Sequence, residues 1–199
     1  MVKRSSAAKP TPAPAPMLKL DFGCGKNKRE GFQGVDRIAF DGVDYVFDIG
    51  CEPWPFADNS VESAHASHFI EHLTQEERVH FFNELWRVMV AHVPQTEVGK
   101  LTFAVPHFAS ARAYGDPTHK WPAFSEWALL YLNREWRKVN APHTDAEHNP
   151  LGFRCDFDWS YGYSMRGDLL TRNAEYQQFA LANHKEAAQD LVGAITVRK

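Results

Sequence analysis

The sequence lacks long apolar runs, paired cysteines and an excess of basic residues. No apolar stretch approaches the roughly 18 residues that a membrane-spanning helix needs, so we expect no transmembrane segment. The three cysteines, Cys24, Cys51 and Cys155, form no Cys-x-x-Cys pair. Their spacing argues against a disulfide framework or a zinc ribbon and favours a reducing compartment such as the cytoplasm. The net charge of -3 provides no basic field, so duplex nucleic acid is not an expected partner.

The first 16 residues, MVKRSSAAKPTPAPAP, contain basic residues but no hydrophobic stretch of the kind that a secretory signal requires. Alternating alanine and proline bury too little apolar surface to offset the entropy of ordering, so we expect a disordered tail over residues 1–16. A chain of 199 residues is long enough to bury one core, and we expect a single domain over residues 17–199.

Residues 17–199 alternate between strand and helix patterns. Seven strands are expected, at Leu18–Phe22, Gln33–Asp36, Asp44–Asp48, Val61–Ser67, Lys100–Val105, Phe153–Trp159 and Gly193–Arg198. Helices are expected over Gln75–Met89, over Ser125–Leu132 and within Arg172–Leu191. This alternation predicts an α/β fold with a Rossmann-like, doubly wound, mainly parallel seven-stranded sheet and an antiparallel edge strand.

The helix expected over Gln75–Met89 has the clearest signals. Thr74, followed by Glu77 three residues later, is the pattern of a capping box. Apolar residues at helical spacing form a stripe for packing on a sheet: Phe82, Leu85, Trp86 and Met89. We interpret the polar residues on the other side as a solvated face without a role: Glu76, His80, Asn83, Glu84 and Arg87.

The segment MLKLDFGCG joins the first expected strand to a glycine turn. Asp21 ends the apolar run, Gly23 permits a turn that a residue with a Cβ atom avoids, and Gly25 lets the backbone approach a ligand. A dinucleotide-binding turn carries a third glycine, but Lys28 and Arg29 stand at that spacing. The pattern therefore favours a ligand with a ribose but no pyrophosphate, such as S-adenosylmethionine.

Two further acids end the second and third expected strands. Ligands of open parallel sheets bind outside the carboxyl ends of the strands, so these ends should share one site. Asp36 can accept hydrogen bonds from both ribose hydroxyls, and Asp48 can accept one from an adenine amino group while Ile49 packs on the ring. The predicted cofactor-binding residues all come from strand ends and the glycine turn: Asp21, Phe22, Gly23, Gly25, Asp36, Arg37, Asp48, Ile49 and Ser67.

The motifs around these acids resemble those of class I S-adenosylmethionine-dependent methyltransferases. LDFGCG resembles the family's glycine motif, GVDR its acidic end of strand two, and FDIGCEPWPFADNSVESAHASHFIEHL its adenine-contacting and strand-four block. Within that block, WPFADNS and HFIEHL are similar to the family's LPF-x-DNS and H-x-x-E-H-L segments. The resemblance is strongest over Leu18–Phe82 and continues more loosely through LTFAVPH.

This resemblance implies an enzyme that transfers a methyl group from S-adenosylmethionine. The chain is similar in particular to short, compact members, which occur in phage genomes and beside glycan-modifying genes. The alternative is a non-catalytic S-adenosylmethionine-binding protein or partner subunit, since intact cofactor residues do not separate the two.

The connection between the first two strands departs from the family's pattern. Lys26–Phe32 is too short for the usual multi-turn helix, whose N-terminus normally helps to hold the cofactor's carboxylate. We expect Lys26, Asn27 or Lys28 to supply the missing positive potential.

The sequence also contains an inverted zinc motif, His68-x-x-Glu71-His72, which offers a zinc hydrolase as a further alternative. A zinc site of this type needs both histidines on one face of a sustained helix. The motif follows a strand, and Thr74 opens a new helix two residues after His72. Because little more than one helical turn fits between them, no metal is expected.

Three histidines near the ends of strands four and five are the candidate catalytic bases: His119, His107 and His68. The segment Phe108–Phe124 leaves strand five and is rich in aromatic residues, so we expect it to form the acceptor pocket or a lid, with His119 as the favoured base or acceptor ligand. Further contacts are expected from Tyr114, Asp116 and Trp121. His143 and His148 lie in a polar run that we expect to be a mobile loop.

The class of methyl acceptor is narrowed mainly by two motifs that the sequence lacks. The chain has no Asp/Asn-Pro-Pro-Tyr/Phe segment of amino-methylating DNA enzymes and no Pro-Cys pair of cytosine C5 enzymes. A small molecule, a sugar and a protein side chain all stay open as acceptors, and the oligomeric state is not indicated.

Overall fold

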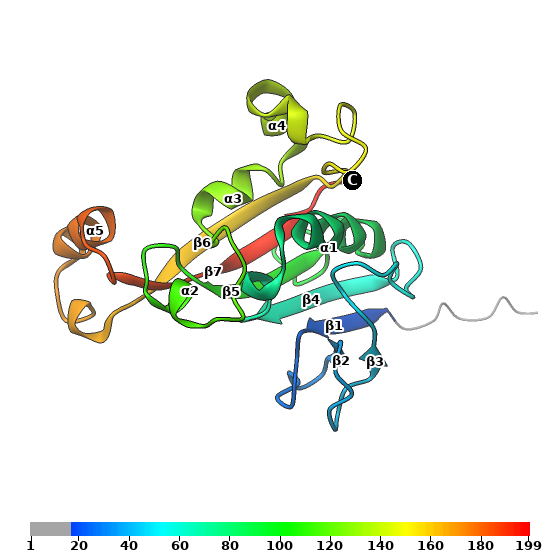
Figure 1. Ribbon diagram of the computed structural model, residues 1–199, viewed down its shortest axis with the longest axis horizontal. Helices are drawn as coiled ribbons and strands as arrows, with labels where there is room; N and C mark the ends of the chain where they lie inside the picture. The colour runs from blue at the N-terminus through cyan, green and yellow to red at the C-terminus, as the bar shows by residue number, and fades with distance from the viewer. Residues whose placement is uncertain (1–16) are drawn as a thin grey trace, which may run out of the picture.

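The computed structural model describes residues 17–199, so the tail expected over residues 1–16 lies outside the described part of the chain. A sheet of seven strands in the order β3-β2-β1-β4-β5-β7-β6 forms the centre of the fold (Figure 1). Its strands are β1 (Leu18–Phe22), β2 (Gln33–Asp36), β3 (Tyr45–Val46), β4 (Val61–Ser67), β5 (Lys100–Pro106), β6 (Phe157–Met165) and β7 (Ala188–Val197). The first five pair in parallel, and β7 runs antiparallel to both β5 and β6. The predicted Rossmann-like mixed sheet is confirmed, with its antiparallel strand one position inside the edge.

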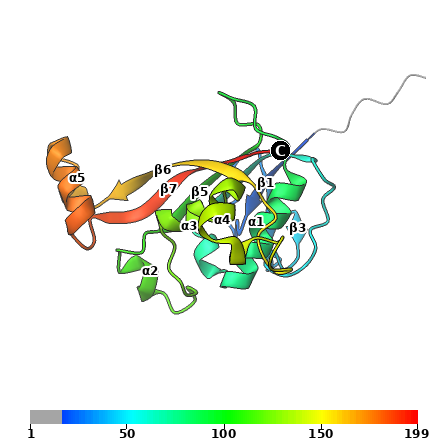
Figure 2. The same ribbon diagram turned by 90° about the horizontal axis from the view of Figure 1, so that it is seen from above.

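Helical segments fill the connections after β4. They are the short 3₁₀ helix η1 (Ile70–His72), α1 (Gln75–Val88), α2 (Arg112–Gly115), α3 (Glu126–Leu130), α4 (Arg134–Asn140), η2 (Pro142–Thr144), η3 (Gly167–Leu169) and α5 (Ala174–Asn183). Figure 2 shows α1, α3 and α4 on one side of the sheet. Within residues 17–199, the connections β1–β2 and β2–β3 contain no helix.

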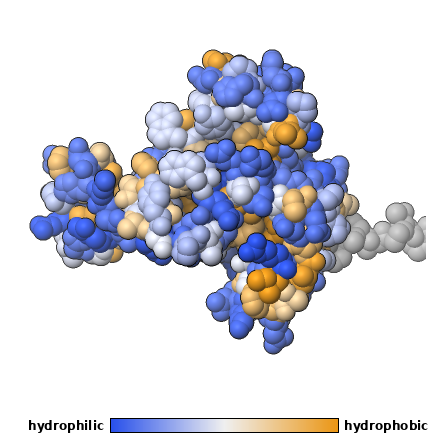
Figure 3. Space-filling model, in the orientation of Figure 1, coloured by the Kyte–Doolittle hydropathy of each residue, from blue (hydrophilic) through white to orange (hydrophobic). Residues whose placement is uncertain are grey.

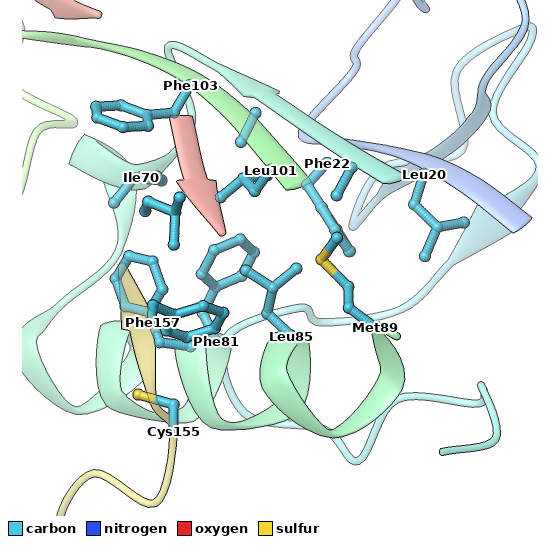
Figure 4. Close-up of a cluster of buried hydrophobic side chains, with 14 of the residues drawn as sticks. Leu20, Phe22, Ile70, Phe81, Leu85, Met89, Leu101, Phe103, Cys155 and Phe157 are labelled. Atoms are coloured by element: carbon cyan, nitrogen blue, oxygen red, sulfur yellow. The ribbon is translucent and has the colours of Figure 1, made fainter. Parts of the chain in front are cut away.

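The core lies between α1 and the face of the sheet that it covers (Figure 4). Leu20 and Phe22 of β1 and Leu101 of β5 alternate along their strands, and all three are fully buried. The ring of Phe81 on α1 meets Phe22 edge to face, with centroids 5.3 Å apart. Alternation along parallel strands therefore supplies one face of the core, and the apolar side of α1 supplies the other.

The opposite face of the same strands is polar. Asp21, His65 and Thr102 lie in register on β1, β4 and β5. The side chain of Arg29 crosses them, with Nη1 3.0 Å from His65 Nδ1 and donating to Thr102 Oγ1 at 3.2 Å. These strands thus alternate between core and polar residues, whereas parallel strands covered by helices on both faces usually carry near-continuous apolar runs.

Helix α1 confirms the predicted capping box and ends one residue before the expected boundary. The Thr74 hydroxyl accepts from the Glu77 N–H, and the Glu77 carboxylate accepts from the Thr74 N–H. The interpretation of its polar side as solvated and without a role is wrong. Asn83 accepts from the Cys155 N–H, and Arg87 donates to the Phe56 carbonyl at 2.8 Å, so this face holds the neighbouring loops.

The bounds of several expected elements were wrong. β6 begins later and β7 earlier than expected, because the two strands form one long antiparallel pair whose glycines and polar residues hide the strand pattern. This pair reaches beyond the rest of the sheet and carries α5 at its end (Figures 1 and 2). The strand expected over Asp44–Asp48 is reduced to Tyr45–Val46, and the helix over Ser125–Leu132 to Glu126–Leu130.

The unexpected helix α4 is held by a buried ion pair. Arg137 has no exposed surface, and its Nε donates to Asp145 Oδ2 at 2.9 Å. Its other nitrogens donate to the carbonyls of Tyr131 and Cys155. Burial raises the pKa of Asp145, but hydrogen bonds from the Glu147 N–H and from Arg137 outweigh it and lower the pKa. The run around His143 and His148 is therefore anchored through Asp145.

Most of the surface in Figure 3 is hydrophilic, and hydrophobic colour gathers over the edge of the sheet at β2 and β3, where Ile38 and Val46 are exposed. Across residues 17–199, none of the helices has the length and hydrophobicity to cross a bilayer.

The buried ion pair generates a stability prediction. Asp145→Ala leaves the Arg137 guanidinium buried without its counter-charge, and losing one partner of such a pair typically costs about 3–5 kcal/mol. Urea unfolding followed by tryptophan fluorescence should show this loss. Asp168→Ala breaks the exposed pair with Arg166 and should leave the unfolding midpoint unchanged. Equal effects of the two substitutions would contradict the structural role of the buried pair.

Candidate functional site

A cavity of about 620 Å³ opens at the carboxyl ends of β1 and β2 and beside η1. We refer to it as the first cavity. Its walls come from three regions of the chain: Gly23, Asp36, Arg37, Asp48, Ile49 and Gly50 after the first strands, His68, Phe69, His72, Leu73, Thr74 and Glu77 around η1, and Pro117, Thr118 and Lys120 after α2. The structure thus brings together predicted cofactor residues and part of the predicted acceptor segment.

Asp36 lies at the end of β2 and organises the glycine turn. Its Oδ2 accepts from the Gly25 N–H at 2.9 Å, and its Oδ1 accepts from the Ile38 N–H at 2.9 Å. Each carboxylate oxygen has a second lone pair, which is free to accept a hydroxyl of a ligand. The carboxylate therefore both shapes the turn and faces the first cavity.

Asp48 and Ile49 form the wall beyond β3. Asp48 Oδ1 accepts from the Gly50 N–H at 3.0 Å, which closes a tight turn and leaves Oδ2 available. Ile49 is almost fully buried, and its carbonyl accepts from the indole N–H of Trp54 at 3.0 Å. This pairing of a carboxylate with an apolar edge suits a flat, amino-bearing ring.

A second cavity, of about 490 Å³, lies on the other side of Gly23. Its walls are Asp21, Gly23, Cys24, Gly25, Lys26, Asn27, Arg29, His65 and Ser67. Lys26 and Asn27 thus contribute to the lining, whereas Lys28 is engaged with Asp44 at 2.8 Å. Gly23 lies in the walls of both cavities.

Asp21 is buried and holds the connection that replaces the usual helix. Its Oδ2 accepts from the Arg29 N–H at 2.7 Å, which folds Lys26–Phe32 back over the strand end. Burial raises the pKa of Asp21, and the hydrogen bond from Arg29 and the nearby His65 and Arg29 charges oppose this effect.

The other predicted cofactor residues, Phe22, Arg37 and Ser67, lie in the core or on the rims of the cavities. The Phe22 ring packs in the core against Trp54, with centroids 4.6 Å apart, so its backbone alone can meet a ligand. Arg37 is exposed on the rim of the first cavity, and Ser67 is exposed in the second.

Of the three candidate bases, His68 lines the first cavity. It follows β4 with a positive φ of 52°, and its Nδ1 lies 3.3 Å from Glu71 Oε1. The nearby Glu71 carboxylate raises the pKa of His68 against the opposing effect of burial.

His107 and His119 do not line either cavity. His107 is buried, with Nε2 3.1 Å from Glu126 and Nδ1 accepting from the Ala109 N–H. His119 is largely buried, and its Nδ1 lies 3.2 Å from the Ala113 carbonyl oxygen.

The expected acceptor segment contributes residues to the first cavity, but its aromatic residues are not among them. Pro117, Thr118 and Lys120 reach the first cavity, whereas Tyr114 and Trp121 are exposed. Sequence reasoning also missed Phe69, which packs on the glycine turn. Its position directly after the histidine of HFIEHL was the available signal.

Several solved structures superpose on this chain at low sequence identity. No family model matches the chain, and neither does any curated protein. An S-adenosylmethionine-dependent methyltransferase from Archaeoglobus fulgidus superposes with a TM-score of 0.57 at 19% identity, covering 92% of this chain and 86% of its own. The Haloferax volcanii methyltransferase in complex with its Trm112 activator gives 0.51 at 12%, covering 92% and 84%. The methyltransferase domain of a bacterial Hen1 gives 0.50 at 11%, covering 92% and 90%. The chain shares the fold of these proteins.

The two glycines of the turn should differ in their tolerance of a side chain. Gly23 has a φ of 65°, and a Cβ atom there would lie 2.3 Å from the Phe69 ring. Gly25 has a φ of 52° but open space around it. Gly25→Ala should cost about 1–2 kcal/mol of stability from the left-handed backbone alone. Gly23→Ala should cost more, because Phe69 must also move.

Urea unfolding of both variants checks this order. Gly42→Ala is the matched control, because Gly42 also has a positive φ and open space but lies outside both cavities. A Gly23→Ala protein as stable as Gly25→Ala would show that Phe69 does not restrain the turn.

Proposed function

We propose that the protein is an S-adenosylmethionine-dependent methyltransferase. The observation that carries this proposal is the first cavity, where Asp36, Asp48 and Ile49 meet at consecutive strand ends. The shared fold with S-adenosylmethionine-dependent methyltransferases supports the same ligand. The motifs LDFGCG and GVDR, which resemble those of class I enzymes, supply Gly23 and Asp36 of this site.

The cofactor would lie across the glycine turn. Asp36 would accept the ribose hydroxyls, and Asp48 would accept the adenine amino group while Ile49 packs on the ring. The amino-acid end of the cofactor would extend past Gly23 into the second cavity. There Lys26 and Asn27 would supply the positive and polar groups for its carboxylate, in place of a helix N-terminus.

Methyl transfer from a sulfonium is an in-line substitution, in which the S–CH₃ bond breaks as the acceptor's lone pair forms the new bond. The protein's part is to align the acceptor and to take up its proton where it has one. His68 is the proposed general base because it lines the cavity, and Pro117, Thr118 and Lys120 would contact the acceptor.

The acceptor classes left open by the sequence, a small molecule, a sugar or a protein side chain, belong to this proposal. So does the finer resemblance to short members from phage genomes and glycan-modifying gene clusters. The zinc hydrolase alternative needs a long helix through His68 and His72, whereas η1 spans Ile70–His72 and does not include His68.

S-adenosylhomocysteine should stabilise the protein. A ligand that binds the folded state at 100 times its Kd adds about 2.7 kcal/mol, which a thermal shift assay detects readily. Asp36→Ala should abolish most of this shift, because the substitution removes the ribose acceptor and frees Gly25. Asp41→Ala removes an exposed acid outside both cavities and should keep the full shift. A folded protein without any shift at millimolar ligand would rule out the proposed cofactor.

Turnover distinguishes an enzyme from a non-catalytic binding protein. Tritiated methyl from S-adenosylmethionine should be transferred into one fraction of a fractionated cell extract. A general base typically contributes about 10²–10⁴-fold, so His68→Ala should lower the rate by that order. Its affinity for S-adenosylhomocysteine should match that of the unchanged protein. An unaltered rate in His68→Ala would exclude this histidine as the base.

A further inference from the structure

Three side chains from two separate segments converge next to the first cavity. Glu71 and His72 belong to η1, and His119 comes from the segment after α2. One potential ligand atom from each lies within 4.8 Å of the other two. The rings of His72 and His119 meet edge to face, with centroids 4.8 Å apart.

The Glu71 carboxylate is buried without a hydrogen-bond partner. The residue is 4% exposed, and neither Oε1 nor Oε2 is hydrogen-bonded. His68 Nδ1 approaches Oε1 to 3.3 Å, within range of an ion pair but without the alignment of a hydrogen bond. The nearby Arg78 guanidinium directs its hydrogen bonds to backbone carbonyls. A buried carboxylate in this state is costly unless further positive charge binds to it.

Both histidines are held in the tautomer that a metal ligand needs. The Thr118 hydroxyl donates its hydrogen to Asp116 Oδ1 at 2.7 Å, so it accepts from His72 Nδ1, which is 3.1 Å away. The Ala113 carbonyl can only accept, so His119 Nδ1 carries a proton as well. Each Nε2 atom is therefore left with a lone pair, and that of His119 lies 3.8 Å from Asp116 Oδ2, which adds negative charge beside the cluster. Metal-binding histidines are typically oriented in this way by a hydrogen bond from the other nitrogen.

We propose that Glu71, His72 and His119 bind a divalent transition-metal cation. Two imidazole nitrogens and one carboxylate oxygen form a set that suits Zn²⁺, Co²⁺ or Mn²⁺. Ligand atoms around a tetrahedral cation lie about 3.3 Å apart, so atoms now within 4.8 Å must close by at most about 1.5 Å.

The cation would take part in acceptor binding. Three protein ligands leave at least one coordination position open for water or for a substrate oxygen. His72 lines the first cavity, so the open position is available to an acceptor that presents a hydroxyl or another oxygen ligand. This role rests on the proposed methyltransferase function, whereas cation binding does not. His119 is then a metal ligand, and its Nε2 is not available as the general base.

Co²⁺ titration of the untagged protein tests the site. Visible d–d absorption bands and calorimetry should report one bound Co²⁺ per chain. Glu71→Gln, His72→Ala and His119→Ala should each weaken binding by more than about 100-fold, because each removes a direct ligand. Thr118→Val should weaken it by about 10–100-fold, because it releases the His72 ring. His143→Ala removes an exposed histidine elsewhere and should leave the affinity unchanged.

Circular dichroism of the same samples checks that each variant is folded. Binding of S-adenosylhomocysteine to these samples tests the proposed cofactor site separately from the metal site. Glu71→Gln keeps the shape of the buried side chain, so this variant keeps the test valid if an alanine variant fails to fold. Absence of binding at millimolar Co²⁺, or an affinity in all three ligand variants equal to that of the unchanged protein, overturns the metal site. Full Co²⁺ binding without any S-adenosylhomocysteine binding would support the site while contradicting the proposed cofactor.

Discussion

The site depends on one buried guanidinium. Arg78 of α1 is 8% exposed and donates to the carbonyls of Ile70, Lys120 and Pro122, the last at 2.6 Å. The Lys120 N–H in turn donates to the Glu71 carbonyl at 2.8 Å. These bonds tie η1 to the segment after α2, although the two lie far apart in the chain. Burial lowers the pKa of Arg78, and the nearby Glu71 charge opposes this. The two walls of the first cavity that come from η1 and from Pro117–Lys120 are therefore anchored to the most regular helix of the fold.

The elements predicted correctly from the sequence are those whose apolar residues follow one regular spacing. Leu18–Phe22, Gln33–Asp36 and Val61–Ser67 were found with their observed bounds because each is a strand of the parallel half of the sheet, ended by a recognisable motif. Helix α4 was missed because its seven residues carry no apolar stripe and are held by Arg137 and Asp145. That contact is tertiary, and no local pattern reports it.

The part of the site that could be predicted from the sequence consists of residues at the ends of strands. Asp36 and Asp48 line one cavity because parallel strands end at the same edge of the sheet. The convergence of Glu71, His72 and His119 was not predictable, since it requires the distant contact between Arg78 and the loop carrying Lys120. The motif His68-x-x-Glu71-His72 was considered for zinc with His68 as a ligand. In the structure, His119 lies in the cluster and His68 lies next to it.

The close packing of Phe69 on Gly23 connects η1 to the glycine turn. Phe69 directly precedes η1, and its ring fills the space where a Cβ atom of the glycine turn would lie. A molecule that shifts η1 on binding must also move Phe69 against or away from the glycine turn, where we propose that the cofactor binds. Any such effect is reciprocal, because each ligand must change the affinity of the other by the same factor. The contact between Phe69 and Gly23 would therefore couple binding at η1 to binding at the glycine turn without any movement between domains.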